Sequence, residues 1–231
     1  MNINSVLENI SQKTRAISVF LWGSRARGDA QEDSDWELGA LFRKEHLISE
    51  YELRQLANAP DNVSIYPYEY NLFICGEIVV PFQRSLYLRE IKLTAKTLLG
   101  EKVVESFSPP PITIVDLLCD LKFALGRASD AIVSFRRGDK TLAARLFFKS
   151  CMFATRDWLI FAQKYFPTTY HEINEMANSE YAELVHKAYS GRFGAIPEEY
   201  LLLDNIHYIN AFIEEQIELE YHRNGNVVLI P

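Results

Sequence analysis

The chain has 231 residues, of which 48% are hydrophobic and 24% charged, and its formal net charge is −7. This length and composition are typical of a folded protein with one large or two small domains, and they argue against disorder. No run reaches the roughly 20 apolar residues of a membrane-spanning helix, and the N-terminus lacks the pattern of a secretory signal, so a cytoplasmic protein is expected. The negative net charge disfavours binding to bulk nucleic acid, so an anionic ligand requires a local basic patch.

The N-terminal part of the chain has a strand–loop–strand pattern. A helix is expected over Ser5–Lys13, followed by the strand-like run "AISVFLW" and a loop that begins at Gly23. The next stretch, "SDWELGALF", alternates and predicts a half-buried strand. This alternation aims the carboxylates of Asp35 and Glu37 toward the same face.

The rest of the first half also mixes helix and strand. A helix is expected over His46–Asn58. The run "VSIYPYEYNLFIC" predicts a strand that lies at a sheet edge or is bulged at Pro67, because proline cannot donate to a neighbouring strand. The run "RSLYLREIKLTAKTLLG" predicts a helix ending at Gly100, and "KVVESF" predicts a short strand that completes the sheet.

The proline run Ser108–Pro111 predicts a domain boundary, which gives domains of residues 1–108 and 109–231. Beyond it, four helical segments joined by short connections are expected. The first has an apolar face from Leu117 to Ala128 and ends at "RRGDK", and the others lie near residues 141–166, 170–189 and 197–222. The predicted fold class is α+β: a small mixed sheet with flanking helices, followed by an all-α bundle. Apolar neighbours predict that the three cysteines are buried small hydrophobes and not a disulfide framework or zinc site: Cys75, Cys119 and Cys151.

The stretch "GSRARGDAQEDSDWEL" combines a tight turn, two cations and a carboxylate pair. Asp35 and Glu37 supply the oxygen ligands that Mg²⁺ prefers together with substrate phosphates. Gly23 lets the backbone approach a phosphate, and Ser24 offers its amide and its hydroxyl. Arg25 and Arg27 are candidates to offset phosphate charge, although two residues so spaced on a helix do not share a face.

This stretch resembles the signature of the DNA polymerase β-like nucleotidyltransferase superfamily, in which Gly-Ser precedes Asp-x-Asp or Asp-x-Glu by about ten residues. The match is close to small prokaryotic members, including the minimal and the kanamycin-type aminoglycoside nucleotidyltransferases. The specific match covers about twenty residues, and the order of a mixed domain and a helical domain extends it loosely along the chain. The resemblance implies that Gly23 and Ser24 bind phosphate and that Asp35 and Glu37 are metal ligands with a catalytic role.

Two further acidic positions follow from the resemblance. Family members usually carry a third carboxylate on a later strand, but "NVSIYPYEYN" has no acid at its centre. Ser64 or Tyr66 occupies the expected position, and Glu69 is the nearest candidate for a third metal ligand. In kanamycin-type enzymes a carboxylate of the helical domain acts as general base, a role for which Asp116 and Asp120 are candidates. Asp120 is preferred because its apolar neighbours suggest partial burial.

The sequence therefore predicts a magnesium-dependent nucleotidyltransferase that moves a nucleoside monophosphate from a nucleoside triphosphate to a hydroxyl and releases pyrophosphate. The acceptor is an aminoglycoside-like small molecule or a protein, with the helical domain forming the other wall of its site, and a homodimer is compatible with the resemblance. Tyr66 or Tyr68 is a candidate to stack on a base or to line the acceptor cleft. The alternatives are a non-catalytic nucleotide-sensing or interaction protein, and the antitoxin of a toxin–antitoxin pair.

Overall fold

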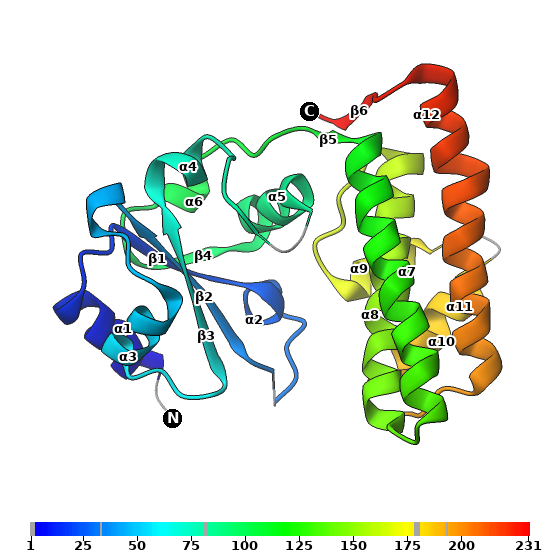
Figure 1. The fold of residues 1–231 in the computed structure, drawn as a ribbon, viewed down its shortest axis with the longest axis horizontal. Helices are drawn as coiled ribbons and strands as arrows, with labels where there is room; N and C mark the ends of the chain where they lie inside the picture. The colour runs from blue at the N-terminus through cyan, green and yellow to red at the C-terminus, as the bar shows by residue number, and fades with distance from the viewer. Residues whose placement is uncertain (1–2, 33, 81–82, 178–180, 193) are drawn as a thin grey trace. The chain divides into compact units, whose positions relative to one another are not determined.

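The computed structural model describes residues 3–32, 34–80, 83–177, 181–192 and 194–231. The chain forms two compact units, Met1–Pro110 and Pro111–Pro231, here called unit 1 and unit 2 (Figure 1). The division falls inside the proline run.

Unit 1 is built on a mixed sheet. In its described residues, four strands lie in the order β3-β2-β1-β4. They span Ser18–Trp22 (β1), Trp36–Phe42 (β2), Val63–Glu69 (β3) and Lys96–Gly100 (β4). β1 is antiparallel to both β2 and β4, whereas β3 runs parallel to β2. β3 lies at an edge of the sheet, as Pro67 predicts, because an edge strand tolerates the missing donor.

Helices cover both faces of this sheet. One face packs against α1 (Ile3–Lys13) and α3 (Glu50–Ala57), and its buried residues include Val19, Leu38 and Ile65. The other face packs against α4, α5 and α6, and its buried residues include Phe20, Leu41 and Tyr68. These three helices span Tyr70–Ile74, Arg84–Thr94 and Val103–Ser106. Because both faces are covered, β2 is fully buried from Leu38 onward, and the prediction of a half-buried strand was wrong.

Several elements of unit 1 differ in extent or type from the sequence-based expectation, beginning with the helix predicted from His46, which starts at Glu50. The helix predicted up to Gly100 ends at Thr94, and residues 96–100 pair with β1 as the fourth strand. A side chain at Gly100 would lie 2.1 Å from the Ile17 carbonyl oxygen, so this glycine serves close strand pairing and not a helix cap. The expected strand "KVVESF" is α6, and β3 stops at Glu69 and continues as α4. In each case tertiary pairing or packing overrides the local pattern.

Unit 2 is helical over most of its length. Its elements are α7 (Ile114–Arg136), α8 (Lys140–Gln163), α9 (Tyr170–Met176), α10 (Ala182–Gly191), α11 (Glu199–Phe212), the π-helical turn η2 (Ile213–Ile217) and α12 (Glu218–Asn224). The helix predicted over residues 170–189 is therefore two helices, and residues 178–180 between them lie outside the described part. None of the described helices has the length and apolar character needed to span a membrane.

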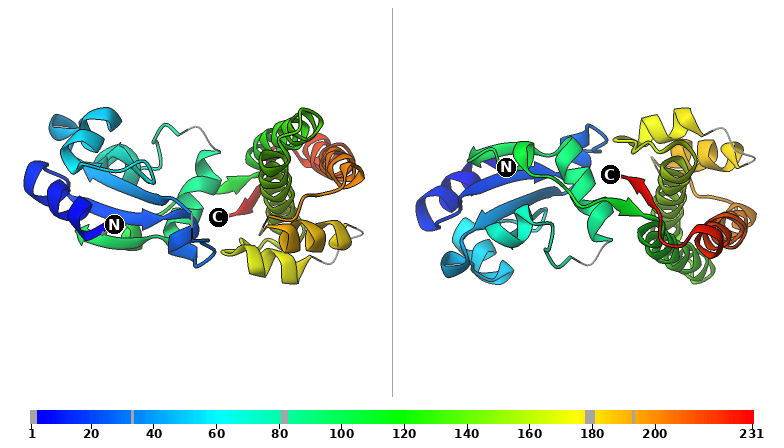
Figure 2. Two further views of the ribbon diagram at one scale, coloured as in Figure 1. Left: turned by 90° about the horizontal axis from the view of Figure 1, so that it is seen from below. Right: turned by 90° about the horizontal axis from the view of Figure 1, so that it is seen from above.

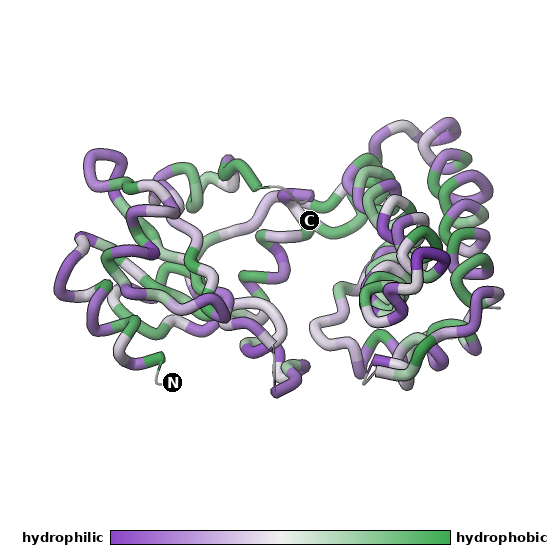
Figure 3. Tube along the Cα trace, turned by 60° about the horizontal axis from the view of Figure 1, so that its bottom comes forward, coloured by the Kyte–Doolittle hydropathy of each residue, from purple (hydrophilic) through white to green (hydrophobic). Residues whose placement is uncertain are grey.

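The bundle is held by its two long helices. α7 packs along α8 and also against α11, and α8 packs against α10 (Figure 2). Hydropathy alternates along these helices turn by turn, as amphipathic helices require (Figure 3). A two-stranded sheet was not predicted: β5 (Ile112–Thr113) pairs with β6 (Val228–Ile230).

The predicted burial of the cysteines is confirmed for one residue. Cys151 is buried in α8, and burial raises the pKa of its thiol to about 12. Cys75 and Cys119 are exposed, so the expectation was wrong for these two. Both follow an apolar neighbour in the sequence but lie on the solvent side of their elements.

Candidate active site in unit 1

The turn after β1 contacts the acidic end of β2. The antiparallel register places Trp22 opposite Glu37, and Gly23 follows directly as the first residue of α2 (Gly23–Arg27). Gly23 has a φ of +71°, and a Cβ added to it would lie 1.9 Å from Oε2 of Glu37. Only glycine fits here, because a side chain would be strained by the backbone and blocked by the carboxylate. The glycine turn and the carboxylate predicted from the sequence therefore meet in the structure.

α2 is a single short turn that ends at Gly28. The carbonyl oxygen of Ser24 accepts hydrogen bonds from the amides of Gly28 (3.0 Å) and Asp29 (2.9 Å). Ser24 itself is half-buried beside buried Gly23. The phosphate-binding role of Gly23 and Ser24 stays a prediction, and the geometry places Gly23 beside the Glu37 carboxylate.

The two predicted metal ligands lie at one end of the sheet. Asp35 directly precedes β2 and is exposed, whereas Glu37 is half-buried as the second residue of the strand. Their spacing puts both on the same face, which is also the face of Trp22. Within the described residues, no group of three His, Cys, Asp or Glu side chains is arranged to hold a metal ion. The site is a carboxylate pair.

The register of β3 contradicts Glu69 as the third ligand. Ser64 pairs with Glu37, whereas Glu69 pairs with Phe42, five residues further along the strand. At a rise of about 3.3 Å per residue, Glu69 lies about 16 Å from the Ser64–Glu37 pair. It belongs to the opposite end of the sheet, where β3 passes into α4. The positions nearest to the carboxylates on β3 are Ser64 and Tyr66.

Tyr66 forms an aromatic wall beside the carboxylate pair. Its ring centroid lies 6.0 Å from that of Trp22, which in turn makes an edge contact with Tyr87 at 4.9 Å. Burial raises the pKa of the Tyr66 phenol, and the charges of Glu37 and Asp35 add to this effect. The phenol is therefore neutral at ordinary pH and able to donate a hydrogen bond.

Tyr68, in contrast, is a core residue. Its hydroxyl lies 2.6 Å from that of Tyr87, and only 8% of the residue is exposed. It is therefore not available to stack on a base. The sequence analysis did not identify Trp22 as part of the site, although its position directly before Gly23 indicates that it lies beside the turn.

Arg25 fastens the loop that carries Asp35. Its Nε and Nη2 donate to the carbonyl oxygen of Ser34 at 3.0 and 2.5 Å, and its guanidinium stacks 4.7 Å from the ring centroid of Trp36. Residues on both sides of Asp35 are thus held by one side chain. This positioning contact was not anticipated, and phosphate binding by Arg25 stays a prediction.

Arg27 connects α2 to the neighbouring helix α5. Its Nε donates to Asp29 at 3.2 Å, and its Nη1 forms an ion pair with Glu90. All three side chains are largely shielded from solvent. Any phosphate contact by Arg27 would have to compete with these two acids, and that role also stays a prediction.

The two acids proposed as a general base in unit 2 have different environments. Asp116 accepts from the amide (2.7 Å) and the hydroxyl (2.9 Å) of Thr113, as part of the capping box of α7. Asp120 is 7% exposed, which confirms its predicted burial, and its Oδ2 accepts from Arg156 at 2.5 Å. Asp116 is thus engaged at a helix terminus, whereas Asp120 belongs to a buried charge cluster.

That cluster also includes Asp157, which the sequence reasoning missed. Arg156 donates from Nε to Asp157 at 3.1 Å, and Asp157 is completely buried. Burial raises its pKa well above the usual range, the charge of Asp120 raises it further, and Arg156 acts in the opposite direction. The signal was present, because Arg156 and Asp157 interrupt an otherwise apolar helical run.

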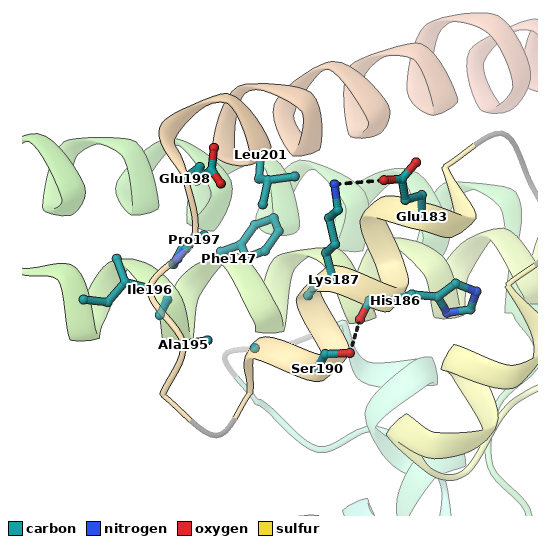
Figure 4. Close-up of a pocket in the computed structure, with 13 residues that line it drawn as sticks. Phe147, Glu183, His186, Lys187, Ser190, Ala195, Ile196, Pro197, Glu198 and Leu201 are labelled. Atoms are coloured by element: carbon teal, nitrogen blue, oxygen red, sulfur yellow. Dashed lines mark hydrogen bonds and ion pairs between the residues drawn. The ribbon is translucent and has the colours of Figure 1, made fainter.

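A separate pocket of about 400 Å³ lies in unit 2 between α8, α10 and the start of α11 (Figure 4). Its walls include Phe147, Ile196 and Leu201, with an ion pair between Lys187 and Glu183 at its rim. None of the predicted site residues lines it.

No protein-family model matches the sequence, and no curated protein matches it. Among solved structures, a toxin–antitoxin with AMP-PNP covers 44% of this chain and 76% of its own at 18% identity, with a TM-score of 0.32, which is too low to establish a shared fold. The spectinomycin adenyltransferase AAD(9) from Enterococcus faecialis, solved with ATP and spectinomycin, covers 90% of this chain and 96% of its own at 15% identity, with a TM-score of 0.52. This second likeness confirms the predicted α+β fold class: the chain has a fold like that of this adenyltransferase.

Proposed function

We propose that this protein is a metal-dependent nucleotidyltransferase that moves a nucleoside monophosphate from a nucleoside triphosphate to a hydroxyl group. The observation that carries the proposal is the contact between Gly23 and Glu37, where an added Cβ would meet the carboxylate at 1.9 Å. The glycine turn can approach a phosphate, and the carboxylate can bind a metal ion. A single metal–nucleotide complex can contact both only because they lie next to each other. The shared fold with an adenyltransferase supports the same reading.

The carboxylate pair fits magnesium. This ion is commonly held by one or two carboxylates, with water and substrate phosphates completing its coordination, so Asp35 and Glu37 suffice on the protein side. When bound, magnesium supplies charge compensation for the triphosphate and lowers the barrier to attack on it. The exposed position of Asp35 leaves that side of the site open to solvent, and therefore to a substrate.

Each residue of the proposed site has a distinct role. Gly23 admits the triphosphate close to the backbone, and Ser24 donates to it. Arg25 holds the loop before Asp35 in place through the Ser34 carbonyl. The acceptor hydroxyl oxygen bonds to the α-phosphorus, the bond to pyrophosphate breaks, and the hydroxyl proton passes to a general base. Asp120, which the resemblance suggested for this role, is buried and its Oδ2 is bonded to Arg156.

The acceptor is proposed to be a hydroxyl of a small aminoglycoside-like molecule or of a protein. The adenyltransferase with the shared fold was solved with ATP and spectinomycin, which supports testing these two compounds first. A homodimer is part of the same hypothesis and is open to measurement by light scattering.

A non-catalytic nucleotide sensor is the second candidate, and one observation favours it. Ser64 and Tyr66 stand on β3 where a third carboxylate is expected, and the register removes Glu69 from the site. A site with two acids retains a way to bind a metal–nucleotide complex but has one fewer group to activate a hydroxyl. A sensor would bind nucleotide and release no pyrophosphate with any acceptor.

The test is calorimetric titration with a non-hydrolysable analogue of each of the four nucleoside triphosphates, with and without magnesium. Wild-type protein should bind one of them in a magnesium-dependent manner, and Asp35→Asn should abolish this binding. Glu45→Gln, at an exposed acid outside the site, is the matched control and should bind normally. Magnesium-independent binding, or equal binding by Asp35→Asn, would refute the metal site. Pyrophosphate release in an acceptor screen then separates enzyme from sensor.

A further inference from the structure

Arg127 in unit 2 is half-buried but lacks an acceptor for its donors. It lies on α7, seven residues after Asp120. Across the described residues, it makes no hydrogen bond or ion pair, whereas its neighbour Arg156 is paired with two aspartates. A guanidinium carries five N–H donors in a planar fork. None of the Arg127 nitrogens is among the fully buried atoms in the described part of the chain that lack a hydrogen-bond partner, so its donors are accessible to solvent and to a ligand.

Two phenyl rings hold this guanidinium in place. Its central carbon lies 4.5 Å from the ring centroid of Phe123, one turn earlier on α7, and 5.5 Å from that of Phe153 on α8. Phe153 also contacts Arg156, at 5.0 Å. Stacking on aromatic faces orients the plane of a guanidinium and leaves its edge free to donate. Arg127 is therefore pre-oriented.

The charge of Arg127 is not matched by a dedicated partner. Asp120 is close enough to act on Arg127 electrostatically, but its carboxylate is already bonded to Arg156 at 2.5 Å. Burial lowers the pKa of Arg127, while the phenol of Tyr170 and the charge of Asp120 oppose this effect. Asp157, the other acid of the cluster, contacts Arg156. Burial raises the pKa of the Asp157 carboxyl and so favours the neutral form of this acid. The cluster as a whole thus carries an excess positive charge at Arg127.

We propose that Arg127, stacked on Phe123 and Phe153, anchors a site in unit 2 for an oxyanion, either the phosphate or the carboxylate group of a small ligand. The planar fork of an arginine matches the two oxygens of either group and binds them through paired, charge-assisted hydrogen bonds. The proposal does not depend on nucleotidyl transfer, because none of the residues that carry it belongs to the Asp35–Glu37 site.

The experiment uses the full-length protein and follows the side-chain Nε–H resonance of Arg127 by NMR, assigned by its loss in Arg127→Lys. Inorganic phosphate, pyrophosphate and acetate are titrated separately, without magnesium. A saturable shift of this resonance with phosphate or pyrophosphate alone identifies a phosphate site, and a shift with acetate as well identifies a general oxyanion site. If none of the three anions moves the resonance, the proposal is wrong.

Calorimetry of variants provides the second readout. Arg127→Met, which keeps the aliphatic packing, should weaken binding of the active anion at least about tenfold, as loss of a charge-assisted pair predicts. Arg127→Lys should weaken it by less, and Arg145→Met, at an exposed arginine on α8, should leave it unchanged. Ser24→Ala reports on the proposed nucleotide site in unit 1. Loss of anion binding in Ser24→Ala with retention in Arg127→Met would overturn this proposal and leave the proposed function standing.

Discussion

Each unit contains a pair of carboxylates, and the two pairs have opposite environments. Asp35 and Glu37 stand at an open sheet end, with Asp35 exposed and Glu37 against a glycine. Asp120 and Asp157 lie inside the helical bundle, where Arg156 bridges them at 2.5 and 3.1 Å. The first pair is proposed to bind a metal–nucleotide complex, whereas the second is bonded to an arginine of the protein itself.

The difference shows what burial does to an acid. A carboxylate in the interior must be paired or protonated, so Asp120 and Asp157 are held by contacts within the bundle. A carboxylate at the surface, such as that of exposed Asp35, is solvated and contributes little to stability, so it remains accessible to a ligand. The following predictions test this contrast, in order of their expected effect on the free energy of unfolding.

The largest effect is expected from Arg156→Met. This change keeps an apolar stem in the bundle but leaves Asp120 and Asp157 without their common cation. Removal of one partner from a buried charge pair costs about 3–5 kcal/mol, so the free energy of unfolding in urea should fall by that amount. Arg136→Met, at an exposed ion pair with Glu199, is the control and should cost less than about 1 kcal/mol. Equal effects of the two changes would show that the buried cluster is not structural.

The glycine against Glu37 gives the next largest effect. Gly23→Ala should lower the free energy of unfolding by about 2–5 kcal/mol, because a left-handed conformation costs about 1–2 kcal/mol and overpacking adds about 1–3 kcal/mol. Gly28→Ala is a matched control, since Gly28 also has a positive φ, of +88°, but an added Cβ would meet nothing within 4 Å. Only the conformational cost should remain there. If both variants lose the same stability, the close approach of Gly23 to the carboxylate is not required.

A third test uses the proton on Asp157. Its pKa is raised in the folded protein, so unfolding releases this proton at any pH between the unfolded value of about 3.9 and the folded one. Wild-type stability should therefore fall with rising pH relative to Asp157→Asn, by up to about 1.4 kcal/mol per pH unit. Denaturation of both proteins across this range measures the difference. A difference that does not change with pH would mean that Asp157 is ionised in the fold.

The contrast between the two pairs was only half visible in the sequence. The order of Gly23, Ser24, Asp35 and Glu37 predicted the unit 1 site, because a motif confined to one strand–turn–strand segment needs only local geometry. Glu69 failed because strand register depends on pairing with β2, which a single sequence does not specify. Arg156 and Asp157 were missed because they meet Asp120 through the packing of α8 on α7.

The fold shows the same limit. Strands β1 to β3 and the long helices of unit 2 followed from periodicity and from turn residues. Residues 96–100 did not, because "KTLLG" continues a helical pattern and becomes a strand only through β1. The aromatic wall of Trp22 and Tyr66 likewise depends on which residues of neighbouring strands share a face.

The smallest effect on stability is expected from Asp35→Asn. A small effect is expected because, unlike Asp120, Asp35 is not part of a buried charge cluster. Asp35 is exposed, so loss of its charge should change the free energy of unfolding by no more than about 0.5 kcal/mol. The same substitution at Asp120 removes one of the two aspartates paired with Arg156 inside the bundle and should cost about 3–5 kcal/mol. Urea denaturation of wild type and the two variants measures the free energy of unfolding of each. Because both variants carry the same Asp→Asn change, the difference between them reports on the environment of the acid. If Asp35→Asn proves as destabilising as Asp120→Asn, the acid at the sheet end is structural, and a loss of magnesium–nucleotide binding in that variant would no longer identify Asp35 as a ligand. If it is neutral and still abolishes binding, the carboxylate acts on the bound metal–nucleotide complex and on nothing else in the fold.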